Sequence, residues 1–348
     1  MLIDWITAYL PMTEIPTDHW QELRKMTDRV MRYCPRTGET RWESSAWDSI
    51  RSDSHQIAFR VGSDAIWIQG SPARVCGSGD AVFGEGPSAA LDLVGCLSRM
   101  ASFVSQQIQL DLPCNPHVWH VTRIDVTGNL ILDDLAAVRI ALRTLRECEG
   151  GRYRVSQQAG DTVYWSHKSR LRSGKAYAKG PHIEYQTKKA DYSGREYTKP
   201  EKDLISRLLR LELKLGSQWI RERIEGNKKW YELTKSDLKN EWNTYFKRMI
   251  GEADMKNDDE LKDRIIAAAK TEGQGKSAYM FFLFIKQNGW QAAKENYPKA
   301  TFFRHTKILR AAGLGDADIS TGNVVQLRRK VLECQVVNNW SELFQHAA

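Results

Sequence analysis

The sequence lacks any apolar run long enough to cross a membrane as a helix. Its most apolar later stretch spans residues 279–285, far below the roughly 20 residues that a bilayer requires. The first residues, MLIDWITAYLPM, contain an acid and no base ahead of a short apolar part, which is not the pattern of a signal peptide. We therefore expect a cytoplasmic protein that is not embedded in a membrane.

Paired cysteines are also missing. The six cysteines show no C-x-x-C spacing, and no histidines accompany them at zinc-finger spacing; they are Cys34, Cys76, Cys96, Cys114, Cys148 and Cys334. This pattern excludes a disulfide framework and a cysteine-based zinc site, and favours small buried thiols in a reducing compartment.

A strong excess of one charge is absent as well. The chain has 51 Lys+Arg against 43 Asp+Glu, a net charge of +8. Such a surface favours polyanions only weakly and does not by itself indicate nucleic acid. With 348 residues, 41% of them hydrophobic, the chain can bury a large core, and its length favours two domains.

The pattern of the chain changes from strands to helices along its length. Runs at 57–61 and 65–69 flank a Gly62-Ser63-Asp64 turn, and Ser88 is a candidate N-cap for a helix reaching Ile108. Further elements are expected as a strand at 117–127, a helix at 134–149 ended by Gly150-Gly151, and strands at 162–166, 174–179, 182–187 and 208–215. We predict an α+β fold: a mostly antiparallel sheet flanked by helices in residues 1–225, then a smaller all-helical domain in residues 226–348.

The strand at 117–127 carries charge in an apolar run. Alternation places Arg123 and Asp125 on one face of the strand. Two charged groups in the middle of a buried strand destabilise the fold unless they are paired or bound to a ligand. A structural ion pair and a functional site explain this strand equally well.

A second segment, residues 173–185, combines four kinds of reactive side chain. Tyr177 and Lys179 share a face of a regular strand, and so do His182 and Glu184 beyond the Gly180-Pro181 break. An imidazole and a carboxylate on one face can bind a single cation. Between residues 168 and 189 there are seven Lys/Arg and one acid, which would attract a phosphate backbone. A solvated basic hairpin is the alternative interpretation.

The strand at 208–215 alternates strictly between leucine and charged residues. Its leucines predict a core face, with Arg210, Glu212 and Lys214 on the other side. On an exposed sheet edge this face needs no function. Beside the two strands above, Glu212 would add a carboxylate to a cation site.

These segments together resemble one family. TRIDV (122–126) is similar to the Ser-Arg-Ile-Asp segment of the filamentous-phage gene II replication proteins, KAYAK (175–179) with HIEYQ (182–186) to their Ala-Tyr-Leu-Lys and His-Val-Glu-Leu-Gln stretch, and RLE (210–212) to their Arg-Phe-Glu. Further similarities occur at 70–75, 82–84, 112–114, 165 and 320–325. Their order is collinear over nearly the whole chain.

The resemblance implies a rolling-circle replication initiator that nicks the plus strand at a phage origin and later rejoins it. It implies that Tyr177 attacks the phosphodiester, leaving a 5′-phosphotyrosine and a free 3′-OH, and that Lys179 stabilises the developing charge or protonates the leaving oxygen. The implied ligands of Mg²⁺ or Mn²⁺ are Asp125, His182, Glu184 and Glu212. The basic residues expected to contact DNA are Arg123, Lys168, Arg170, Arg172, Lys175, Arg210 and Lys214.

The same resemblance implies partners: origin DNA, both supercoiled duplex and single-stranded, and a host helicase, polymerase and single-strand-binding protein in the bacterial cytoplasm. Gly180-Pro181 is an insertion relative to the family pattern, directly before the implied ligands His182 and Glu184. Tyr185, Tyr192 and Tyr197 are alternative nucleophiles. There are two rival functions: a plasmid or conjugative relaxase, and an origin-binding regulator without catalytic activity.

The C-terminal part has a pattern of its own. Residues 290–297 and 301–313 predict two helices joined by a turn. Arg304 and Lys307 lie on one face of the second helix, with Phe302 and Leu309 on another, as in a helix that enters a DNA groove. A packed helical pair with a solvated basic face is the alternative.

Overall fold

The fold was analysed in a computed structural model of the chain. It describes residues 2–26, 28–46, 48–52, 55–72, 75, 82, 92–146, 155–189, 192, 196–226, 229–250, 258–315 and 318–319.

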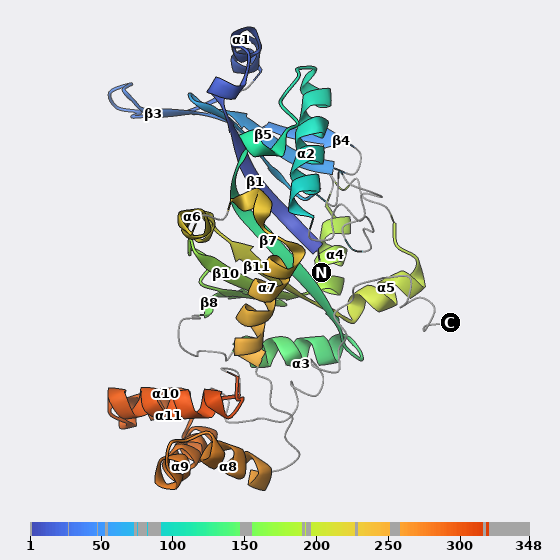
Figure 1. The fold of residues 1–348 in the computed structure, drawn as a ribbon. Coiled ribbons are helices and arrows are strands. Elements are labelled where there is room, and N and C mark those ends of the chain that lie inside the picture. The colour runs from blue at the N-terminus through green and yellow to red at the C-terminus, as the bar shows by residue number, and fades with distance from the viewer. Residues whose placement is uncertain are drawn as a thin grey trace.

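A nine-stranded antiparallel sheet forms the centre of the protein (Figure 1). Its spatial order is β4-β5-β6-β1-β7-β11-β10-β9-β8. The strands are β1 (Leu2–Pro11), β4 (Asp48–Ser52), β5 (His55–Val61), β6 (Ala65–Gly70), β7 (His120–Ile131), β8 (Val155–Ala159), β9 (Thr162–Trp165), β10 (Arg172–Ala178) and β11 (Leu208–Leu215). A separate two-stranded ribbon consists of β2 (Arg29–Tyr33) and β3 (Thr40–Ser45). The predicted α+β class with a mainly antiparallel sheet is confirmed.

Helices flank the sheet and follow it. They are α1 (Thr17–Lys25), α2 (Leu93–Ile108), α3 (Leu135–Arg146), α4 (Lys179–Thr187), α5 (Lys199–Ser206), α6 (Ser217–Glu225), α7 (Lys235–Ile250), α8 (Asp258–Ala267), α9 (Glu272–Asn288), α10 (Trp290–Asn296) and α11 (Lys299–Ala311), with short 3₁₀ turns η1 (Met12–Glu14), η3 (Pro116–Val118) and η4 (Trp230–Glu232). Among the described residues no helix is long and apolar enough to cross a membrane.

Local sequence signals account for most of these elements. The hairpin of β5 and β6 turns at the expected place, residues 62–64. Helix α2 begins after Asp92, whose carboxylate accepts a hydrogen bond from the Gly95 amide. The expected cap, Ser88, and the expected stop, Gly150-Gly151, lie outside the described residues. The strand predicted from residue 117 begins at His120, because Pro116 starts a 3₁₀ turn first.

The strand predicted at 182–187 is wrong, because these residues belong to helix α4. The Gly180-Pro181 pair was interpreted as a strand break. Pro181 is instead the third helical residue, where a missing N–H costs no intrahelical hydrogen bond. Gly180 also allows α4 to lie close to α5, since a Cβ there would come within 2.8 Å of the Ser206 Cα.

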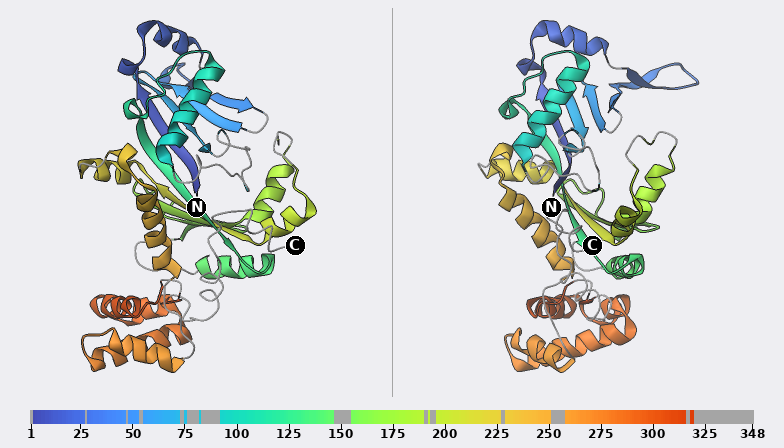
Figure 2. Two further views of the ribbon diagram at one scale, coloured as in Figure 1. Left: turned by 45° about the vertical axis from the view of Figure 1, so that its right-hand side comes forward. Right: turned by 90° about the vertical axis from the view of Figure 1, so that its right-hand side faces the viewer.

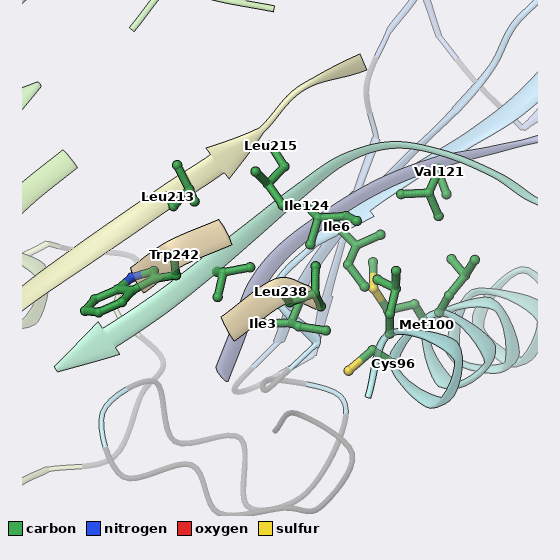
Figure 3. Close-up of a cluster of buried hydrophobic side chains, with 14 of the residues drawn as sticks. Ile3, Ile6, Cys96, Met100, Val121, Ile124, Leu213, Leu215, Leu238 and Trp242 are labelled. Carbon is green, nitrogen blue, oxygen red and sulfur yellow. The ribbon is translucent and has the colours of Figure 1, made fainter. Parts of the chain in front are cut away.

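One face of the sheet holds the main hydrophobic core, which α2, α3 and α7 cover. In Figure 3, Cys96 and Met100 of α2 lie beside strand residues such as Ile6, and Leu238 and Trp242 of α7 lie over β7 and β11. The Trp242 ring fills the space that a side chain would need at Gly128, where a Cβ would lie 2.7 Å from the indole. The Trp242 indole N–H also donates to the Leu211 carbonyl. Helix α7 is therefore part of the sheet's core.

Helices α8 to α11 enclose a second core, built around side chains such as Phe281, Phe302 and Leu309. The division predicted after residue 225 would assign α7 to this helical part. Because the buried residues of α7 belong to the sheet's core, we propose that the boundary falls between α7 and α8.

Candidate active site

The second face of the sheet carries polar residues in rows across β10, β11 and β7. Strand pairing aligns Tyr177 with Arg210 and Asn129 in one row. The next row contains Lys175, Glu212 and Thr127, and a third contains Ser173, Lys214 and Asp125. Because directly paired residues share a face, three strands from distant parts of the sequence form one polar surface. Strand β11 thus lies between the other two strands that carry the predicted site.

Tyr177 is the centre of this surface. Its hydroxyl donates a 2.7 Å hydrogen bond to Glu212 Oε1, and Lys175 Nζ lies 3.2 Å from Glu212 Oε2. The same ammonium lies 4.0 Å from the centre of the Tyr177 ring. Only 3% of Tyr177 is exposed, and burial together with the Glu212 charge raises the pKa of its phenol well above 10. In this conformation the phenol is a protonated hydrogen-bond donor.

The Glu212 carboxyl is held as an anion. Burial alone would raise its pKa, but Lys175, Arg210 and the hydrogen bond from the Tyr177 hydroxyl lower it below the usual range. The carboxylate therefore accepts from the phenol at neutral pH.

Arg210 fills the interior beside Tyr177. Its Nε donates to Asn129 Oδ1 at 2.7 Å, and its Nη1 lies 3.7 Å from Asp4 Oδ1. Asp4 reaches this face through a register shift between Ile3 and Trp5, where β1 pairs irregularly with β7. Two fixed partners thus hold the guanidinium next to the phenol.

Helix α4 begins directly after β10 and covers Tyr177. The Lys179 ammonium lies 5.9 Å from the Tyr177 ring centre, and the His182 ring lies 5.0 Å from it. Burial, then repulsion from Arg210, lowers the pKa of Lys179 well below its usual value. Burial, then Lys179 and Lys175, lowers the pKa of His182 to about 3. His182 is therefore neutral at neutral pH, and burial disfavours the ammonium form of Lys179.

Arg123 and Asp125 form a bidentate ion pair on β7. The guanidinium donates to both carboxylate oxygens, at 2.8 and 2.6 Å. Burial is the largest effect on this carboxyl and raises the pKa of Asp125 to about 6, with Arg123 opposing it and Glu212 and Asp4 adding to it. The two residues are thus paired with each other in this conformation, and the choice between a structural and a functional role stays a prediction.

The four predicted metal ligands do not come together. In a helix, residues two apart point roughly 200° apart, so His182 faces Tyr177 while Glu184 lies on the exposed side of α4. Both oxygens of Asp125 are engaged by Arg123, and Glu212 is engaged by Lys175 and Tyr177. Within the described part of the chain, no three His, Cys, Asp or Glu residues are grouped to hold a metal ion. The predicted ligand set does not fit Mg²⁺ or Mn²⁺ in this conformation.

Three comparisons relate this geometry to known proteins. Residues 2–242 match the family described as the N-terminal part of the phage gene II replication-associated protein. The chain belongs to this family. The replication-associated gene II protein of Enterobacteria phage I2-2 is 26% identical over 351 residues, which cover 96% of this chain and 94% of that protein. A solved rolling circle replication initiator protein from Geobacillus stearothermophilus aligns with a TM-score of 0.28 and 11% identity, over 65% of this chain and 78% of that one.

The match to the gene II protein family covers the whole polar surface. It runs from β1, which carries Asp4, into α7, and stops before α8 to α11. The resemblance to gene II-type replication proteins is confirmed, and the residues around Tyr177 lie within the matched region.

The basic residues predicted to contact DNA have different surroundings. Lys168, Arg170, Arg304 and Lys307 are exposed. Arg210 is buried, Arg172 pairs with Glu241 at 2.9 Å, and Lys214 donates to the His167 carbonyl. Together with Lys175 and Arg123, these three have partners within the protein, so they are not free phosphate contacts in this conformation.

Two members of the site were not found from the sequence. Asp4 is an acid in an apolar N-terminal run, but the strand irregularity that turns it toward Arg210 has no sequence signal. Asn129 lies on the same face of β7 as Asp125 and Thr127, so alternation extended past Val126 would have found it. Among the alternative nucleophiles, Tyr185 is exposed on α4 and Tyr197 is buried in a separate small cluster.

Proposed function

We propose that this chain is a rolling-circle replication initiator that nicks one strand of origin DNA with Tyr177 and later rejoins the strand. The observation that carries the proposal is the hydrogen bond from the Tyr177 hydroxyl to Glu212, surrounded by Lys175, Lys179 and Arg210, in a member of the gene II replication-associated protein family. The combination provides a nucleophile, a proton acceptor and cations for a phosphate.

Glu212 is placed to act as the general base. A phenol is a weak nucleophile until its proton leaves, and the acceptor is already at hydrogen-bond distance. The raised pKa of Tyr177 keeps the hydroxyl unreactive while the site is closed. A phosphodiester reaches it only after side chains packed on the phenol, His182 among them, move aside.

The cations around Tyr177 suit the negative charge of the reacting phosphate. Lys175 lies over the phenol ring, and Arg210 is held beside it by Asn129 and Asp4. A phosphate close to Lys179 would favour the ammonium form of this lysine, because a nearby anion opposes the burial that lowers its pKa. Cations fixed before the reaction stabilise the transition-state charge without reorganisation.

The proposed step is a transesterification. The Tyr177 oxygen forms a bond to phosphorus, its proton passes to Glu212, and the bond from phosphorus to the 3′ oxygen breaks. The leaving 3′ oxygen takes a proton from a neighbouring ammonium, for which we propose Lys175, since its Nζ lies 4.0 Å from the Tyr177 ring centre and that of Lys179 lies 5.9 Å from it. The phosphotyrosine ester keeps the energy of the broken bond, so attack by a 3′-OH can rejoin the strand.

Mg²⁺ or Mn²⁺ dependence stays a prediction from the family resemblance. Because the four predicted ligands do not form one site, the mechanism above contains no metal step. Nicking assays with Mg²⁺, with Mn²⁺ and with EDTA measure this metal dependence directly.

Helix α11 is proposed as an additional DNA contact. Arg304 and Lys307 lie on its exposed face with Phe303, and Phe302 and Leu309 are buried. This distribution supports the proposal, and it is also the one expected of a packed helical pair with a solvated basic face. A host helicase, polymerase and single-strand-binding protein are proposed partners on the family resemblance alone.

The decisive experiment incubates purified protein with supercoiled plasmid carrying the cognate origin, in the presence of Mg²⁺ or Mn²⁺. We expect nicked circles and a protein–DNA adduct that survives denaturant, and we expect Tyr177→Phe to abolish both. Tyr185→Phe, an exposed tyrosine on α4, is the matched control and should form the adduct normally.

An unchanged adduct with Tyr177→Phe would rule out Tyr177 as the nucleophile. If the wild-type protein binds origin DNA but neither nicks it nor forms an adduct, the protein is a non-catalytic origin-binding regulator. Nicking that depends on mobilisation partners would indicate a relaxase instead.

A further inference from the structure

The ribbon of β2 and β3 extends away from the body of the protein (Figures 1 and 2). All residues of β2 are exposed, as is most of β3, so both faces of the ribbon meet solvent. In the right-hand view of Figure 2 the ribbon projects toward the same side as α4, the helix that covers Tyr177.

Apolar side chains are concentrated on this ribbon. Four of the nine exposed large hydrophobic side chains among the described residues lie on it: Val30, Met31, Tyr33 and Trp42. Tyr33 is 62% and Trp42 48% exposed. A two-stranded ribbon is marginally stable by itself, and apolar surface gathered on one projecting element indicates a binding surface.

Arginines accompany these side chains. Arg32 is paired across the strands with Trp42, which puts a cation and an aromatic ring on one face. Arg36 lies in the connection between the strands, and Arg41 at the start of β3. Arg29 has a partner in Glu43 at 3.2 Å, whereas Arg32, Arg36 and Arg41 make no ion pair within the described part of the chain.

We propose that this ribbon inserts into a groove of duplex DNA beside the cleavage site. The proposal rests on the proposed function, which brings origin duplex to the Tyr177 side of the protein. The major groove of B-DNA is wide enough to admit a two-stranded ribbon, and a ribbon with both faces exposed is free to enter it. Arginines without carboxylate partners meet the phosphates, and Tyr33 and Trp42 supply apolar contact to the bases. A protein partner docked on a flat surface would cover one face only.

The first test measures duplex binding over a range of salt concentrations, using full-length protein in the Tyr177→Phe background so that no strand is cut. Each phosphate contact contributes about 0.9 to the slope of log K against log salt. We expect Arg32→Ala to lower this slope by about 1. Arg143→Ala removes the same charge from an exposed position on α3 and should leave the slope unchanged. Equal slopes for both variants would overturn the proposal.

A second variant tests the apolar contact. Trp42→Ala should weaken duplex binding about tenfold without changing the salt slope, because the indole carries no charge. The ring is exposed, so the thermal midpoint should not fall. If Trp42→Ala binds duplex DNA as tightly as the parent protein, the ribbon face that carries Trp42 does not contact the DNA.

Cys34 provides a probe at the end of β2. Hydrogen bonding with Thr37 lowers the pKa of its thiol to about 7, so we expect it to react with iodoacetamide at neutral pH. We expect duplex DNA to protect Cys34 from alkylation, with exposed Cys114 as the internal reference. Equal protection by a single-stranded oligonucleotide of the same sequence would overturn groove insertion. Protection without DNA that grows with protein concentration would instead identify a second copy of the chain as the occupant.

These outcomes separate the two proposals. Absence of the covalent adduct with the wild-type protein, or its persistence in Tyr177→Phe, assigns failure to the nicking proposal. Duplex affinity that does not respond to Arg32→Ala or Trp42→Ala assigns failure to the ribbon and favours a host protein as its partner.

Discussion

At the scale of single residues, the contact between Tyr177 and Glu212 decides the chemistry that we propose. Glu212→Gln keeps the volume and an acceptor oxygen but cannot take up the phenolic proton. We expect adduct formation to slow about 10²- to 10⁴-fold, the usual range for loss of a general base. The measurement is the single-turnover rate of adduct formation with a labelled oligonucleotide.

Glu184→Gln is the matched control, because Glu184 lies on the exposed side of α4. It should react at the wild-type rate. An equal loss of rate in both variants, relieved by raising the metal concentration, would restore Glu184 as a metal ligand.

His182 makes stability depend on pH. The pKa of His182 is about 3 in the folded protein against an ordinary 6.5, so as pH falls below about 6.5 the unfolded chain takes up a proton that the folded chain does not. The free energy of unfolding therefore falls as the pH drops from about 6.5 toward 3, by at most about 1.4 kcal/mol per pH unit. Above pH 6.5 the stability that neutral His182 allows is fully present. Urea unfolding at pH 7.5 and 4.5 should show a smaller stability loss in His182→Gln than in the wild type. An equal loss of stability in wild type and His182→Gln would contradict the assignment of this pH dependence to His182.

At the scale of elements, α7 fixes the shape of the sheet under the site. Its Trp242 fills the space over Gly128 and hydrogen-bonds to β11. Trp242→Ala should destabilise the protein by about 3–5 kcal/mol through the cavity that it leaves. The loss of unfolding free energy is measured by thermal or chemical unfolding of wild type and variant. Lys239→Ala, exposed on the same helix, should change stability by less than about 0.5 kcal/mol. A small effect of Trp242→Ala would show that α7 is not part of the core.

Helix α4 shows where local patterns were insufficient. Residues 182–187 alternate in a way that suits a strand, yet α4 starts at Lys179, next to the strand that carries Tyr177. Packing against α5 and the sheet decided in favour of the helix, and this choice turned His182 toward Tyr177 and Glu184 away. The strictly alternating β11, by contrast, was predicted with its bounds unchanged.

At the scale of the whole molecule, two separate hydrophobic cores suggest two folding units. A chain truncated after residue 250 should stay folded and form the Tyr177 adduct with a short single-stranded oligonucleotide. We expect it to bind duplex origin DNA more weakly, because α11 is missing. Circular dichroism measures its folding, an adduct assay its reaction with the oligonucleotide, and a binding assay its affinity for duplex DNA. An unfolded truncated protein would contradict the boundary between α7 and α8.

The sequence by itself determined the family and the candidate residues for the proposed chemistry. Period-2 alternation placed Arg123 with Asp125 and Arg210 with Glu212, and the collinear motifs singled out Tyr177 and the family. Local patterns could do this because a side chain's face on a regular strand depends only on its neighbours in sequence.

Only the tertiary structure decided how those residues are used. It paired Arg123 with Asp125, directed Tyr177 to Glu212, and brought Asp4 to Arg210 through a strand irregularity. Strand order and register arise from contacts between segments far apart in the chain, and burial then sets the charge of each group. No local pattern contains either, so the proposed nucleophile was predicted from the sequence, while its proposed proton acceptor emerged only from the fold.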